Sequence, residues 1–171
     1  MKKNVLISIS FLLLFLFSCK DDNKTENNDL ITISGITELN IQGMSIGTVD
    51  TTDWRLDDKW LTTIEDLFKR KSVSEKKSEQ GVITVKYFMV KAYPNPTTDV
   101  INFDFGLAPN SYCDLRIVDS RLNIIFSCDS LSTLIRFDLS SSQYKNKMFR
   151  SYYKIYNNDI IYRGHGDIKI N

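Results

Sequence analysis

The sequence predicts a mainly β protein: an antiparallel β-sandwich of about seven strands, preceded by one amphipathic helix and a disordered tether. Three observations lead to this prediction. Apolar residues alternate with polar ones from residue 81 to the end of the chain, which is the spacing of half-buried strands. Turn residues interrupt this alternation at short intervals, and no helical period lies among the strands. Many short strands without intervening helices are typical of a sandwich.

The first 18 residues have the features of a signal peptide. Lys2 and Lys3 precede an apolar run over residues 5–17, which is too short and wrongly flanked for a membrane-spanning helix. The run ends in the sequence LFSC at residues 16–19. This sequence resembles the bacterial lipobox, and the resemblance implies that Cys19 is acylated and becomes the first residue of the mature protein. An ordinary secretory signal with a chance cysteine is the alternative.

Residues 19–29 are polar and charged after Cys19, a composition that predicts a disordered tether. The acidic pair at residues 21–22 resembles the surface-export signal of Bacteroidota lipoproteins, with ordinary solvated charge as the alternative. Acyl chains on Cys19 would hold the protein firmly on a membrane. We therefore expect an exported protein, lipid-anchored to the outer membrane and facing either the periplasm or the cell surface.

Residues 30–80 form an N-terminal segment with a helical stripe. Residues 30–53 alternate weakly, so one or two short strands are expected there. Residues 57–70 predict an amphipathic helix, because large apolar residues recur on one face: Trp60, Leu61, Ile64, Leu67 and Phe68. We expect this face to pack on the protein's own core, and a partner-binding helix is the alternative. The acidic pairs at 57–58 and 65–66 are expected to face solvent. Residues 71–80 are polar and are expected to be a linker.

Residues 81–171 form the predicted sandwich domain. Turn residues separate its candidate strands, which are expected at residues 82–91, 100–105, 112–118, 123–128, 134–139, 148–156, 160–163 and 167–170. Gly164 and Gly166 are the expected turn between the last two strands. The alternation places seven apolar residues in the core: Leu115, Ile117, Ile124, Phe126, Ile135, Phe137 and Leu139.

The segment YPNPTTDVI, residues 93–101, opens this domain. Pro94 and Pro96 lack a backbone N–H, so strand pairing is expected to stop there and resume near Val100. Asn95 is expected to close the turn through its side chain. The segment resembles the opening of the C-terminal sorting domains of type IX secretion cargo, and a looser likeness extends over residues 82–171. The resemblance implies a small Ig-like sandwich.

Two features depart from that family. Leu122 stands near a position where the family usually has a glycine. Sorting cargo is normally released by an ordinary signal peptidase, whereas this chain resembles a lipoprotein at Cys19. The chain is therefore more similar to small Bacteroidota lipoproteins that retain such a sandwich as their main folded body. That resemblance implies no particular function.

Cys113 and Cys128 are the cysteines that remain once Cys19 is acylated. If residues 119–122 form a four-residue hairpin loop, Cys113 lies directly opposite Cys128, within reach of a disulfide. A structural disulfide and a pair of buried free thiols both remain open. A redox role is disfavoured, because the spacing is not that of a CxxC motif.

The sequence provides little material for catalysis. His165 is the only histidine, and Asp167 would share its strand face, but one histidine and one aspartate are at most half a metal site. We expect His165 to lie in a solvent-facing turn. The spacings of nucleophile elbows, zinc proteases, phosphate loops and EF-hands do not occur. We therefore expect no catalytic residue, no metal ion and no cofactor.

The charge of the chain is nearly balanced, with 22 Lys and Arg against 21 Asp and Glu. This balance argues against nucleic acid as a partner. The leading hypothesis is a non-enzymatic, lipid-anchored envelope protein that presents an Ig-like interaction module to a protein or glycan ligand. A type IX sorting module is the alternative, and a small glycan-binding or hydrolytic lipoprotein is a third hypothesis.

Overall fold

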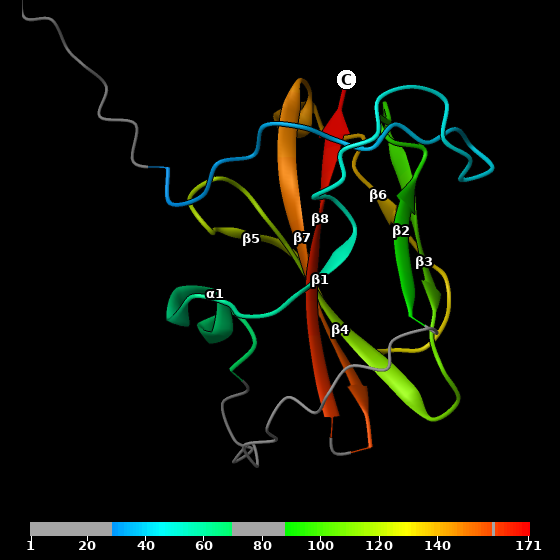
Figure 1. Cartoon of the computed structure of the whole chain (residues 1–171). Helices are drawn as coiled ribbons and strands as arrows, with labels where there is room; N and C mark the ends of the chain where they lie inside the picture. The colour runs from blue at the N-terminus through cyan, green and yellow to red at the C-terminus, as the bar shows by residue number, and fades with distance from the viewer. Residues whose placement is uncertain (1–28, 70–87, 159) are drawn as a thin grey trace, which may run out of the picture.

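The computed structural model describes residues 29–69, 88–158 and 160–171, and it confirms the predicted antiparallel β-sandwich (Figure 1). One sheet has five strands in the order β1-β8-β7-β4-β5, and the other has three in the order β2-β3-β6. The elements are β1 (Arg55–Asp57), α1 (Thr62–Asp66), β2 (Met89–Tyr93), β3 (Val100–Gly106), β4 (Ser111–Val118), β5 (Ile124–Leu131), β6 (Ile135–Asp138), the 3-10 helix η1 (Ser142–Tyr144), β7 (Lys147–Asn157) and β8 (Ile160–Ile170).

The core lies between the two sheets and is rich in aromatic rings. Ile101, Phe103 and Phe105 alternate along β3 and are buried. Phe137 of β6 stands edge-on to Phe103, with ring centroids 5.4 Å apart. The larger sheet contributes Leu115, Ile117, Phe149, Tyr153, Ile155, Ile168 and Ile170. Burial of these side chains is the main force that holds the sheets together.

The predicted core is correct for four of its seven residues and wrong for one. Leu115, Ile117, Phe137 and Leu139 are buried, and Phe126 and Ile135 are partly buried against the core. Ile124 is 48% exposed. The cause is an irregularity in the β4–β5 ladder that places Ile124 opposite Val118. Because Val118 packs on the outer face of the sheet, Ile124 is carried to that face as well.

The last strand corrects a second prediction, because residues 160–170 form one strand without a turn. A Cβ atom on Gly164 would collide with the ring of Tyr153, and one on Gly166 would collide with the indole of Trp54. The two glycines therefore leave room for aromatic rings that cross the strand. In this strand they allow close packing and do not reverse the chain.

The N-terminal segment also differs from its prediction. Residues 29–54 form no named strand, and isolated bridges join Leu39 to Ser45 and to Asn95. The expected helix over 57–70 is shorter, because residues 55–57 extend and pair with residues 163–165 of β8. The predicted linker at 71–80 and the start of the first predicted strand lie outside the described residues.

The apolar stripe of α1 packs on the protein's own sheet, as predicted. Trp60, Ile64 and Phe68 are buried against Val118 and Tyr152 on the outer face of the five-stranded sheet. Figure 1 shows α1 beside this sheet, on the side away from β2 and β3. Leu61, also predicted for the stripe, is 67% exposed. Residues 55–68 are thus packed into the same folded unit as the sandwich.

Candidate functional site

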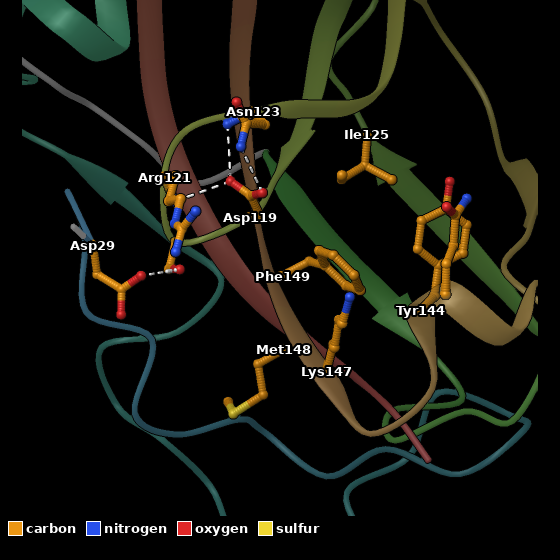
Figure 2. Close-up of a pocket in the computed structure, with 11 residues that line it drawn as sticks. Asp29, Asp119, Arg121, Asn123, Ile125, Tyr144, Lys147, Met148 and Phe149 are labelled. Atoms are coloured by element: carbon orange, nitrogen blue, oxygen red, sulfur yellow. Dashed lines mark hydrogen bonds between the residues drawn. The ribbon is translucent and has the colours of Figure 1, made fainter. Parts of the chain in front are cut away.

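A hollow of about 500 Å³ at one end of the sandwich is the candidate binding site (Figure 2). It lies between the β4–β5 turn, η1 and the first residues of β7. Tyr144 and Phe149 form an aromatic wall, with ring centroids 5.7 Å apart in an edge-to-face contact. Arg121, Lys147 and Asp29 place charges of both signs around the hollow.

The β4–β5 turn that borders the hollow is built around Asp119. Its carboxylate accepts hydrogen bonds from the backbone N–H groups of Arg121 and Asn123, each at 2.9 Å, and from the Asn123 side chain at 2.9 Å (Figure 2). Burial works to raise the pKa of Asp119, but these hydrogen bonds outweigh it and hold the pKa below its ordinary value. Asp119 is therefore a turn-forming residue and is unsuited to act as a general acid.

The same turn receives the N-terminal end of the described chain. The Ser120 hydroxyl donates to Asp29 at 2.5 Å, and the backbone N–H groups of Leu30 and Ile31 donate to the Ser120 carbonyl at 2.8 and 3.0 Å. Asp29, the last residue of the predicted tether, thus already contacts the sandwich. The hollow lies where the chain that follows Cys19 joins the fold.

Leu122 in this turn has a positive φ of 63°, a conformation that glycine adopts at little cost. The backbone at Leu122 thus has a glycine-like geometry, while the leucine side chain packs beside the cluster of Val118 and Tyr152.

A second group of charged residues lies between α1 and the five-stranded sheet, and we call it the α1 ionic cluster: Glu65, Lys154 and Arg163. Lys154 Nζ lies 2.8 Å from a Glu65 oxygen, and Arg163 donates to the other oxygen. The Lys154 side chain is only 2% exposed and lies 5.1 Å from the Phe68 ring centre. Burial works to raise the pKa of Glu65, but the two cations outweigh it and lower the pKa.

The prediction that Glu65 faces solvent is therefore wrong, because Lys154 and Arg163 on β7 and β8 lie beneath the short helix. The adjacent Asp66 does lie toward solvent, where it pairs with Lys69. A signal for the covered face was present in the residue order YYKIY at 152–156. Large side chains fill both faces of this strand, which is the pattern of a strand covered on both sides.

The structure places His165 within β8, and the expected solvent-facing turn is wrong. Its Nδ1 lies 2.8 Å from Asp57, whose carboxylate also accepts the Trp60 indole N–H at 2.7 Å. Asp57 is thus 12% exposed, although its acidic pair was expected to face solvent. Asp167, which would share a strand face with His165, accepts two hydrogen bonds of 2.7 Å from Arg150, its direct cross-strand neighbour.

Asn95 of the YPNP segment connects distant parts of the chain. The named strands stop at Tyr93 and resume at Val100, as predicted, although isolated bridges join Asn95 to Leu39 and Thr97 to Ile170 between them. The fully buried Asn95 side chain does not close its own turn: it donates to the Asp167 carbonyl at 2.9 Å and the Thr37 carbonyl at 3.2 Å, and it accepts the Lys169 N–H at 3.0 Å. Only the folded structure brings these backbone groups together.

The carboxylate of Asp53, which contacts the same strand, has a perturbed acidity. Burial raises its pKa to about 6, although hydrogen bonds from the backbone N–H groups of Asp167 and Thr37 work in the opposite direction. Asp53 thus links the N-terminal segment to β8, as Asn95 does.

Cys113 and Cys128 are both free thiols, and the predicted register that paired them is wrong. Cys113 lies opposite Leu131, and Cys128 lies opposite Leu115. Irregularities in the β4–β5 ladder shift the register on both sides of Ile117. Burial raises the pKa of the Cys113 thiol, which makes that thiol inert. The predicted lipidation site, Cys19, lies outside the described residues.

In the part of the chain that the structure describes, no group of three or more His, Cys, Asp or Glu side chains could hold a metal ion. Within the same ranges, no helix has the length and apolar character needed to cross a membrane. No family model, curated protein or solved structure matches this chain.

Proposed function

We propose that this protein is a lipid-anchored envelope protein that presents an Ig-like interaction module on the outer membrane. The lipobox-like sequence that ends at Cys19 supports the anchor. The observation that carries the rest is the packing of residues 29–69 into the sandwich: β1 extends the five-stranded sheet, and Glu65 pairs with the buried Lys154. This packing favours a sandwich that is retained as the working body of the protein.

A type IX sorting module is the second candidate, and the YPNP segment favours it. In that case the C-terminal domain would be removed by cleavage in residues 71–80 or just before Tyr93. Either cut would allow β1 to leave β8 and Glu65 to leave Lys154, whose side chain is only 2% exposed. Loss of one partner from a buried pair is strongly destabilising. Separation of the two pieces after such a cut is therefore disfavoured energetically, which supports the lipoprotein over the sorting module.

The hollow beside Tyr144 is the proposed ligand site. A partly exposed aromatic ring with nearby hydrogen-bonding side chains suits either a sugar ring or a protein side chain. An oligosaccharide array and a pull-down from an envelope extract distinguish these ligands, with wild type compared with Tyr144→Ala. Tyr112→Ala is the control, because Tyr112 is 40% exposed and lies at the other end of β4. Binding that survives Tyr144→Ala unchanged would place the ligand elsewhere.

Metabolic labelling with a fatty acid tests the anchor. The wild type should incorporate label, and Cys19→Ala should not. Equal labelling of the two proteins would contradict the proposal.

A further inference from the structure

Residues 39–49 form an exposed loop without a single charged side chain, and we call it the apolar loop. Its large side chains are unusually open to solvent: Ile41 is 70% exposed, Met44 59%, Ile46 64% and Val49 58%. Exposed apolar residues that occur singly are ordinary, but a contiguous group of them marks an interaction surface.

The backbone of the apolar loop is held in place while these side chains are exposed. Leu39 is buried and exchanges two backbone hydrogen bonds with Asn95, at 2.8 and 2.9 Å. The Asn40 side chain accepts the Met44 N–H at 3.0 Å, and the Ile46 N–H donates to the Glu38 carbonyl at 3.1 Å. The apolar side chains are therefore presented by an ordered turn.

The apolar loop lies at the end of the sandwich to which the N-terminal chain attaches. The loop is joined to Asn95, and the neighbouring Thr97 bridges to Ile170 at the end of β8. Ile170 pairs with Lys147, which begins β7 beside the β4–β5 turn that binds residues 29–31. Figure 1 shows the segment from residue 29 through this loop running across the end that carries the C-terminus. Leu30, 63% exposed, adds a further apolar side chain at the same end.

The length of the preceding chain indicates which surface this end faces. The ten residue-to-residue steps from Cys19 to Asp29 can span at most about 35 Å. The eleven residues of β8 run a further distance of about 37 Å to the far end of the sandwich. The far end could approach the membrane only with this chain almost fully extended, so an acyl anchor on Cys19 favours the end that carries the apolar loop as the one nearest the membrane.

We infer that the apolar loop inserts Ile41, Met44, Ile46 and Val49 into the interface of the bilayer that holds the lipid anchor. This inference rests on the proposed lipid anchor at Cys19. Uncharged apolar side chains partition favourably about 5–10 Å into the boundary between headgroups and acyl chains. The contact would fix the orientation of the sandwich on the membrane, which a tether alone does not do.

The test uses the mature full-length lipoprotein in phosphatidylethanolamine–phosphatidylglycerol vesicles that contain lipids brominated near the top of the acyl chain. Ile46→Trp places a fluorophore in the apolar loop, and Tyr112→Trp places one at the opposite end of the sandwich. Both positions are exposed, so both variants should fold, and circular dichroism checks this. The signal of Trp54 and Trp60, measured in wild type, is subtracted. We expect strong quenching and a blue shift for Ile46→Trp, and neither for Tyr112→Trp.

Flotation of the same samples separates this inference from the lipid anchor. If the protein floats with the vesicles but bromine quenches the tryptophans at positions 46 and 112 equally, the loop contact is wrong and the lipid anchor stands. A blue shift at Ile46→Trp that bromine does not quench also overturns the loop contact, because the loop would then cover a second copy or another protein. If the protein does not float, the anchor is wrong. Ile46→Trp and Tyr112→Trp are then measured again with a maleimide lipid coupled to Cys19. Cys128→Ser in both proteins prevents coupling at Cys128, so the loop contact is tested in either case.

Discussion

Removal of the Glu65 carboxylate should destabilise the whole sandwich, although Glu65 lies on a helix of only five residues. Glu65 is the ion-pair partner of Lys154, whose ammonium lies on a side chain that is 2% exposed. In Glu65→Ala this cation loses its ion-pair partner, while the Phe68 ring remains 5.1 Å away and Asp114 remains its cross-strand neighbour. Breaking a buried pair by removal of one partner costs about 3–5 kcal/mol. Because Glu65 itself is 29% exposed and water can reach the vacated position, we expect the lower end, about 3 kcal/mol.

Urea unfolding followed by tryptophan fluorescence measures this change, with the midpoint shifted and the slope unchanged. Asp66→Ala is the matched control, since Asp66 is the last residue of the same helix and forms an exposed pair with Lys69, and it should cost less than about 0.5 kcal/mol. The double variant Glu65→Leu/Lys154→Met should recover most of the loss, because an apolar pair of similar volume replaces a buried ion pair at little cost.

The pH dependence of the Glu65 effect has a definite sign. The two cations lower the pKa of Glu65 in the folded protein, so its stabilising contribution is present above the unfolded pKa and lost as the pH falls through the folded one. The difference between wild type and Glu65→Gln should therefore shrink on acidification. A loss below about 1 kcal/mol for Glu65→Ala near neutral pH would refute the reasoning, because it would mean that the buried lysine needs no partner.

Three further perturbations test other parts of the structure. Asn95→Ala removes three hydrogen bonds of a fully buried side chain and should lower the free energy of unfolding by about 3 kcal/mol; an unchanged urea midpoint would contradict the role of this side chain. Phe137→Ala should cost about 3–5 kcal/mol, because Phe137 is 9% exposed in the core, and a loss under about 1 kcal/mol would contradict that placement. Asp53 has its pKa raised to about 6, so the stability of wild type relative to Asp53→Asn should fall as the pH rises from about 4 to 7; a flat difference would show that Asp53 titrates normally.

The sequence was sufficient to predict the sandwich and the positions of its central strands, because alternation is a local property. It was insufficient where a distant side chain decides the structure. Gly164 and Gly166 have the local signature of a turn, but in the fold they lie within β8 and leave room for the rings of Tyr153 and Trp54. The irregularities that separate Cys113 from Cys128 and expose Ile124 likewise arise from strand pairing. No local pattern reports such pairing.

The candidate site was harder to predict for the same reason. The hollow depends on residues 29, 119–123 and 144–149, which the fold brings together. The partners of Asn95 and Glu65 are likewise distant in the sequence. The N-terminal signal, in contrast, is read from adjacent residues, so Cys19 could be predicted without a structure.

The intact mass of the protein from the membrane fraction tests the central proposal most directly. The proposal predicts one mature species that begins at an acylated Cys19 and ends at Asn171. A mature species cut within residues 71–80 or just before Tyr93, or one whose Cys19 carries no lipid, would contradict it.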